Sequence, residues 1–125
     1  MALIKQSFIT KDELIPQLKN SKIIDCLIKN GNEIVSIHKK YRKVLIDIWK
    51  SLPTEKMENQ STFKFKVTDE HGYKGFYWCS SINRSFRNKD ATLTFKEILH
   101  MCELNNLSIN IKIKLETEEI VLFIQ

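Results

Sequence analysis

The sequence predicts an α+β fold: a four-stranded, mainly antiparallel sheet packed with an N-terminal group of helices. Residues 62–80 and 107–124 each alternate apolar and polar side chains on both sides of a polar turn, as a hairpin with one buried face does. Apolar residues recur every three or four positions in residues 34–52, which predicts a helix. Because an isolated hairpin is marginal in water, we expect the two hairpins to share one sheet covered by helices.

The length of the chain sets the domain organisation. With 125 residues, 42% of them hydrophobic, the chain suffices for one domain with a core and is too short for two. We therefore expect a single domain over residues 1–125. Within it, residues 1–55 are expected to be mainly helical, and residues 61–125 to hold the two hairpins with a helix between them.

The first elements are short. Residues 3–9 are apolar and predict either a strand or an extended lead-in. Thr10 and Glu13 have the spacing of a capping box, which marks the start of a helix. Since Pro16 follows, this helix is either very short or begins at the proline.

Two longer helices are expected next. The apolar positions of residues 21–29 predict a helix that ends at Asn30 and Gly31. Residues 34–52 give the strongest helical pattern, and the polar residues 54–61 predict a surface connection.

The first hairpin, residues 62–80, allows two registers. With a four-residue loop Phe65 lies opposite Phe76, and with a two-residue loop it lies opposite Trp78. Both registers place Phe63, Phe65, Val67, Phe76 and Trp78 on one face. Both place Lys64, Lys66, Tyr73 and Tyr77 on the other.

A polar loop, a helix and the second hairpin complete the prediction. Residues 80–90 predict the loop, and a second capping box at Thr94 and Glu97 begins a helix that ends at Asn105 and Asn106.

In the second hairpin, pairing Leu115 with Ile120 places Val121 and Phe123 on the outward face. Lys112 and Lys114 share that face in this register.

Three basic surfaces are candidate binding sites. On the outer sheet face, aromatic rings are able to stack on bases while lysines neutralise phosphates. The alternative is that Val121, Phe123 and Tyr77 pack under the N-terminal helices. The residues of this predicted face are Lys64, Lys66, Tyr73, Tyr77, Lys112, Lys114 and Phe123.

The second candidate is a basic helix face, and the third is the polar loop. Four cations on one helix suit a phosphate backbone or an acidic protein groove, and the alternative is a solvated face. Loop arginines suit phosphates or carboxylates, and the alternative is a connector with its phenylalanine in the core. The helix residues are Lys39, Lys40, Arg42 and Lys43, and the loop residues are Arg84, Phe86, Arg87 and Lys89.

Catalytic signals are weak. The three histidines lie on different predicted elements, and His100 and Cys102 point to different faces of one helix. The sequence has no phosphate-binding glycine loop and no hydrolase or metalloprotease motif. We expect no metal, no cofactor and no enzymatic activity, with a small ribonuclease that uses His71, Tyr73 and Arg84 as the third-ranked alternative.

The charge distribution favours an anionic partner. The net charge is +5, and residues 1–60 carry 11 Lys and Arg against 7 Asp and Glu. Residues 90–125 carry 3 against 6, so the basic character belongs to the first two thirds. Three cysteines without pairing motifs and an N-terminus without a signal-like apolar run predict an intracellular, reducing location, with no membrane association.

We therefore expect a small non-enzymatic protein that regulates or inhibits by docking on nucleic acid or a nucleoprotein complex. Abundant Ile, Lys and Asn suggest AT-rich coding DNA, as in phages and mobile elements, and hence an inhibitor of a host nuclease or defence system. The alternative is a protein-only interaction module of the antitoxin, immunity or chaperone type, with homodimerisation as one form.

Overall fold

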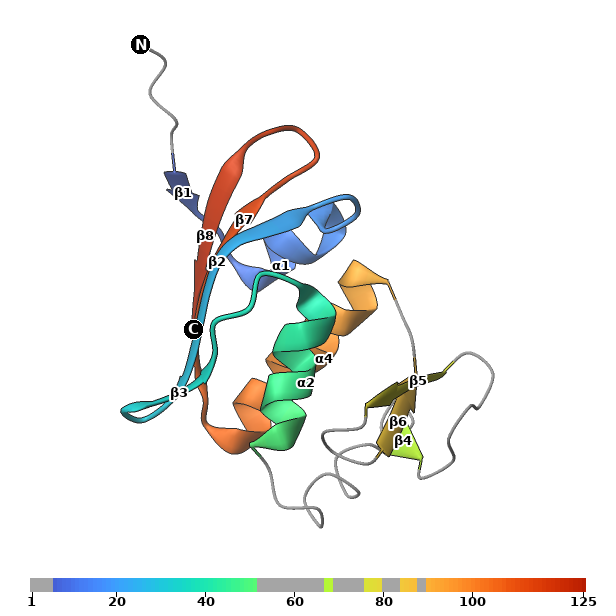
Figure 1. The fold of residues 1–125 in the computed structure, drawn as a ribbon. Helices are drawn as coiled ribbons and strands as arrows, with labels where there is room; N and C mark the ends of the chain where they lie inside the picture. The colour runs from blue at the N-terminus through green and yellow to red at the C-terminus, as the bar shows by residue number, and fades with distance from the viewer. Residues whose placement is uncertain (1–5, 52–66, 69–75, 80–83, 88–89) are drawn as a thin grey trace.

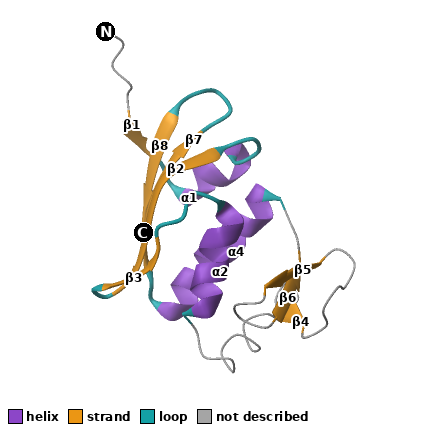
Figure 2. Ribbon diagram, in the orientation of Figure 1, coloured by secondary structure: helices purple, strands orange, loops and turns teal. Residues whose placement is uncertain are grey.

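The computed structural model describes residues 6–51, 67–68, 76–79, 84–87 and 90–125. They form an α+β fold with a mixed five-stranded sheet, three α-helices beside it and a separate three-stranded sheet (Figures 1 and 2). The elements are β1 (Gln6–Phe8), α1 (Lys11–Leu14), the 3-10 turn η1 (Ile15–Gln17), β2 (Lys22–Asn30), β3 (Glu33–Ser36), α2 (Tyr41–Lys50), β4 (Val67–Thr68), β5 (Phe76–Cys79), β6 (Arg84–Arg87), α4 (Ala91–Asn105), β7 (Ser108–Lys114) and β8 (Ile120–Ile124).

The five-stranded sheet has the order β1-β8-β7-β2-β3. Strand β1 runs parallel to β8, and the other neighbours are antiparallel. The prediction of a four-stranded sheet made of the two hairpins is therefore wrong. Only the second hairpin belongs to this sheet, and three N-terminal strands complete it.

Residues 21–29 form strand β2, which corrects the predicted helix. The strand pairs with β7 from Lys22 to Lys29, a contact between segments far apart in the chain. Asn30 and Gly31 do not end a helix; Gly31 and Asn32 make a two-residue turn into β3, with Gly31 at φ +60°. Glycine reaches this conformation without steric cost.

The single helix predicted over residues 34–52 is instead a strand followed by a shorter helix. The chain pairs as β3 up to Ser36, then turns and begins α2 at Tyr41. The helical rhythm is confirmed within α2, which buries Val44, Leu45 and Ile48. The prediction failed because Ile34 and Ile37 continue that rhythm without being helical, and both are exposed.

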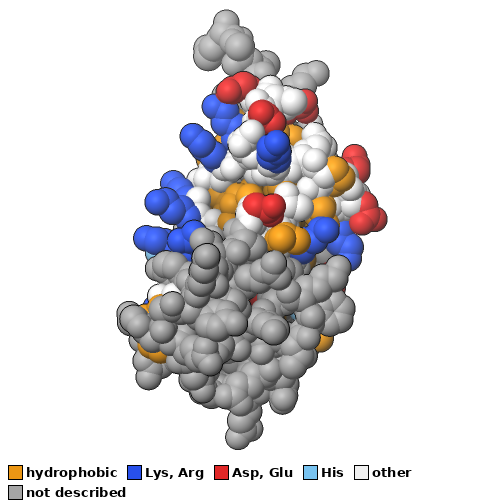
Figure 3. Space-filling view, turned by 90° about the vertical axis from the view of Figure 1, so that its right-hand side faces the viewer, with side chains coloured by type: hydrophobic (Ala, Val, Ile, Leu, Met, Phe, Trp, Pro, Cys, Tyr) orange, Lys and Arg blue, Asp and Glu red, His pale blue; other side chains and the backbone are white. Residues whose placement is uncertain are grey.

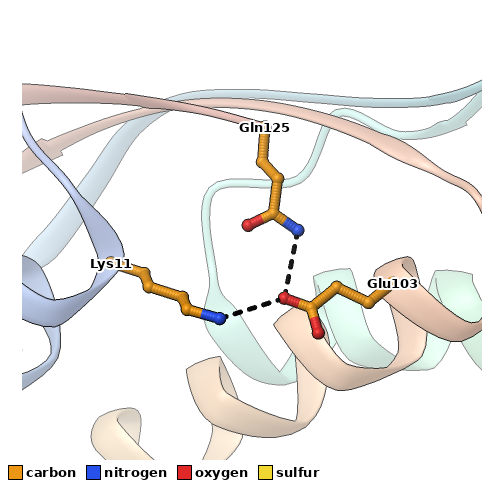
Figure 4. A network of polar contacts seen from close by, with 3 residues as sticks. All are labelled: Lys11, Glu103 and Gln125. Atoms are coloured by element: carbon orange, nitrogen blue, oxygen red, sulfur yellow. Dashed lines mark hydrogen bonds and ion pairs between the residues drawn. The ribbon is translucent and has the colours of Figure 1, made fainter.

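The capping box at Thr10 is confirmed, and the helix it begins is very short. Thr10 Oγ1 accepts a hydrogen bond from the backbone N–H of Glu13 at 3.3 Å. Pro16 falls in η1 directly after this helix. Lys11 at the start of α1 also joins distant segments, because Glu103 Oε1 on α4 accepts from both Lys11 Nζ and Gln125 Nε2 at 3.3 Å (Figure 4).

Helix α4 begins four residues earlier than the predicted capping box. Asp90 is the N-cap, and its Oδ1 accepts from the backbone N–H of Leu93 at 2.9 Å. Thr94 and Glu97 are buried inside the helix and do not cap it. The predicted stop is confirmed, because Asn106 ends the helix in the left-handed conformation at φ 56°.

The second hairpin is confirmed, but its register is one residue away from the prediction. Lys114, not Leu115, pairs with Ile120, and Ile111 pairs with Phe123. Leu115 N–H donates to Glu119 O at 2.8 Å around a three-residue loop in which Glu118 is left-handed at φ 74°. Because side chains alternate along a strand, this shift exchanges the two faces of β8.

The core lies between one face of the five-stranded sheet and the helices α1, α2 and α4 (Figure 1). Phe95 of α4 is at its centre and makes edge-to-face contacts with Tyr41 and Phe123, with ring centroids 6.1 and 5.8 Å apart. The buried apolar residues on the sheet side are Ile23, Cys26, Ile28, Ile109, Ile111, Ile113, Val121 and Phe123.

The predicted first hairpin contributes to a separate sheet of order β4-β6-β5. Val67 pairs with Phe86, and Phe76 pairs with Arg87, so β4 and β5 do not pair with each other as either predicted register requires. The predicted polar loop contains the central strand, β6. Phe63 and Phe65 lie outside the described residues.

Candidate functional site

The candidate site is a cluster of cations around the N-terminal end of α2. Lys39, Lys40, Arg42 and Lys43 are all exposed, as predicted for a basic surface. Two of them precede the helix rather than lie on it, because Lys40 is its N-cap in an extended conformation.

The local chemistry of this helix end is unfavourable without an anion. Among the described residues no side chain caps the backbone N–H groups of the first turn, and that turn holds no acidic residue. The positive end of the helix dipole is thus surrounded by positive side chains, each of which costs about 0.3–1 kcal/mol in an exposed site. A bound anion would reduce this repulsion and accept hydrogen bonds from N–H groups at the start of the helix.

The cluster borders a groove between the starts of α2 and α4. The groove has a volume of about 440 Å³ and is lined by Lys40, Tyr41, Arg42, Lys43, Ile46, Ala91 and Thr94. Figure 3 shows the helix side of the molecule, where Lys and Arg side chains gather along the left edge of the described surface.

Tyr41 and Thr94 give the groove a fixed wall. Tyr41 Oη is 2.7 Å from Ser21 Oγ. Burial raises the pKa of the Tyr41 phenol, and the hydrogen bond with Ser21 offsets part of that rise. Thr94 Oγ1 donates to Asp90 O at 2.7 Å. Both side chains are therefore held by neighbours, whereas Lys40 and Lys43 have no ion pair among the described residues.

The acidic residue nearest in sequence to the cluster, Asp47, is already engaged. Its Oδ2 accepts from Ser36 Oγ at 2.9 Å and lies 3.3 Å from His38 Nε2. Sequence reasoning missed this contact because it placed His38 on the helix and did not single out Ser36.

Ser36, His38 and Asp47 have the residue types of a hydrolytic triad but not its arrangement. Ser36 is 2% exposed and donates to Asp47, the carboxylate that His38 also contacts, so the histidine does not face the serine hydroxyl as a base. Ser36 Oγ also accepts the backbone N–H of His38 at 3.4 Å. The arrangement fixes the turn from β3 into α2, and with it the position of Lys39 and Lys40.

The predicted outer sheet face is divided by the structure. Lys112 and Lys114 do lie on the face of the five-stranded sheet opposite the core, half-buried. Phe123 does not: it is 4% exposed in the core, because the hairpin register is shifted by one. Tyr77 belongs to the three-stranded sheet and pairs with Phe86, so it cannot share a sheet face with Lys112.

The other predicted residues fall into two groups. Arg84, Phe86 and Arg87 lie on strand β6 and not in a loop. The remaining ones lie outside the described residues: Lys64, Lys66, Tyr73, Lys89 and His71.

Within the described ranges, no three His, Cys, Asp or Glu side chains are grouped to hold a metal ion. Cys26 and Cys102 are buried free thiols, and burial raises the pKa of each to about 12; Asp47 adds to the effect at Cys26, and Cys26 adds to it at Cys102. Neither thiol is therefore a ready nucleophile near neutral pH. None of the helices among the described residues is long and apolar enough to span a membrane.

Comparison with protein-family models, with curated proteins and with solved structures returns no match.

Proposed function

We propose that this protein is a non-enzymatic binding protein that docks on nucleic acid, free or within a nucleoprotein complex, through the basic end of α2. The observation that carries the proposal is the groove where Lys40, Arg42 and Lys43 surround a helix N-terminus that no side chain of the described ranges caps. A helix start usually carries a capping side chain or an acidic residue, and α2 has neither among the described residues. Departures of this kind concentrate at functional sites.

The shape of the site favours a polymer over a small anion. The groove is open and lies on the surface, and Lys39 extends the row of cations beyond it. Each lysine that meets a phosphate releases counterions, so several weak contacts along a backbone add up to a strongly salt-dependent affinity.

We also propose that the protein inhibits a nuclease or a defence complex. This regulatory role is supported by the AT-rich coding bias alone. A ribonuclease would need His71 and Tyr73, which lie outside the described residues, and nothing in the described site favours it.

Fluorescence anisotropy with labelled single-stranded and duplex DNA and RNA tests the proposal. We expect binding that weakens steeply between roughly 50 and 200 mM salt. The double variant K40A/K43A should lose about tenfold in affinity and lower the salt slope by about 2, or about 1 per lysine.

The matched control is K22A/K112A, which removes the same charge from the outer face of the five-stranded sheet. It should retain most of the affinity. Binding that does not respond to salt, or an equal loss in both double variants, contradicts the proposed site.

A further inference from the structure

We infer that the outer face of the five-stranded sheet is a docking surface for an acidic, amphipathic segment of another protein. This face is distinct from the basic end of α2, and the inference does not depend on the proposed function. All described helices lie on the opposite face of the sheet (Figures 1 and 2).

The outer face is rich in apolar side chains. Phe8 and Ile124 are 77% and 53% exposed at the β1–β8 side, and Ile34 is 63% exposed on β3 at the other. The register places Phe8 beside Leu122, which is half-buried, and Leu27 of β2 is half-buried as well. Phe8, Leu122 and Ile124 thus form one apolar group on the adjacent strands β1 and β8, while Ile34 lies across the polar outward positions of β7. An exposed apolar group bordered by polar residues is a common mark of an interaction site.

The same face carries a positive charge excess. Lys22, Lys29, Lys112 and Lys114 occupy outward positions of β2 and β7, and Asp25 pairs in register with Lys112. Lys114 Nζ is 2.7 Å from Glu118 Oε2, while Lys112 and Asp25 have no ion pair among the described residues. Apolar positions flanked by cations are complementary to apolar residues flanked by carboxylates.

The position of the lysines argues against a second copy of this chain as the occupant. Strand β7 is the middle strand of the sheet, and it presents Lys112 outward. A twofold axis through the centre of the face would bring the two copies of this lysine together, and like charges in an interface cost several kcal/mol. An acidic partner replaces that repulsion with attraction.

The size of the face suits a single helix or hairpin. Five strands about 4.8 Å apart place the outer two roughly 19 Å apart. A helix of about 14 residues is about 21 Å long and crosses that width.

Isothermal titration with designed peptides tests the inference. The probe is an amphipathic helical peptide with Leu and Phe on one face bordered by Glu, and the control peptides replace Glu by Lys or the apolar residues by Ser. We expect the acidic amphipathic peptide alone to bind, with an affinity in the micromolar range typical of a small interface.

The protein variants locate the site. F8S/I124S and K112E should each lower the affinity for the acidic peptide at least tenfold. The matched control I37S/L104S changes two apolar residues that are also exposed, at 62% and 51%, outside the outer face, and should bind as the unaltered protein does.

Three results would overturn the inference: no binding of the acidic peptide, equal losses in the control variant, or a stable dimer in sedimentation equilibrium that F8S/I124S dissolves. A loss of DNA binding in K112E as large as in K40A/K43A would instead assign the face to nucleic acid. F8S/I124S tests the peptide site alone and K40A/K43A tests the DNA site alone, so failure of one proposal leaves the other standing.

Discussion

Both faces of the five-stranded sheet carry apolar side chains on strand β8, yet only one face is covered by described helices. On β8, Val121 and Phe123 are buried against the helices, while the alternate residues Leu122 and Ile124 lie on the outer face. An antiparallel sheet with one solvated face ordinarily carries polar residues there. On β8, composition therefore does not distinguish the faces, and the helix layer and the register do; on β7, apolar residues alternate with polar ones as the rule predicts.

The largest expected effect is on stability and separates the two faces. Phe123→Ala removes a ring in contact with Phe95 and should lower the free energy of unfolding by about 3–5 kcal/mol. Phe8→Ala, on the outer face, should change it by less than about 0.5 kcal/mol. Urea denaturation of both variants measures the contrast, and equal losses would show that the faces are not as different as described.

The next effect concerns the thiols on the covered side. Burial raises the pKa of Cys26 and Cys102 to about 12, whereas the unfolded thiols ionise near the ordinary value of 9.0. Between pH 9 and 12 the unfolded chain has thus lost protons that the folded chain keeps, so this contribution to stability declines as pH rises.

Thermal melts across that pH range check the thiol prediction. The variant C26A/C102A should show a shallower decline in melting temperature above pH 9 than the unaltered chain, because other groups titrate equally in both. An identical decline would mean that the two thiols are not held protonated by the core.

A smaller effect tests the turn that sets the register. Glu118 is left-handed at φ 74°, a conformation that costs a non-glycine residue on the order of 1 kcal/mol or more. Glu118→Gly should raise the free energy of unfolding by about 0.5–1 kcal/mol, even though it removes the exposed ion pair with Lys114.

Thr117→Gly is the matched control for this turn, because Thr117 does not adopt a positive φ. It should be neutral or destabilising. If it stabilised the protein more than Glu118→Gly did, the three-residue loop and the register that follows from it would be incorrect.

The smallest effect is expected at the exposed contact between Lys11 and Glu103. Both side chains are about half exposed, so solvent screens the pair at 3.3 Å. Lys11→Ala should lower the free energy of unfolding by no more than about 0.5 kcal/mol, and a loss above 1 kcal/mol would show that the α1–α4 junction is more rigid than its exposure indicates.

The sequence allowed prediction where local chemistry decides the structure. The hydroxyl of Thr10, the alternation of residues 107–115 and the Asn105–Asn106 stop act within a few residues, and each prediction was confirmed. The exposure of the four cations Lys39, Lys40, Arg42 and Lys43 also followed from their charge.

The failures occurred where distant contacts decide. A short apolar run such as residues 21–29 fits a strand or a helix, and pairing with β7 selects the strand. A signal for it was present, because Gly31-Asn32 is a hairpin dipeptide. No such signal marks Glu118, since glycine or asparagine usually occupies a left-handed loop position, and the hairpin register was lost for that reason.

The candidate site shows the same division. Composition located the cations, but their arrangement around a helix end depends on the chain turning after Ser36, which the Asp47 contact holds. The predicted register wrongly placed Phe123 on the outer face, whereas the observed register places Leu122 and Ile124 there.

Chemical-shift mapping of the isotope-labelled protein with single-stranded DNA tests the central claim most directly. The account predicts that amide shifts concentrate at Lys39 to Ile46 and at Ala91 to Thr94, around the groove, and vanish at high salt. Shifts centred on Phe8, Lys112 and Leu122, or no shifts at low salt, would contradict it.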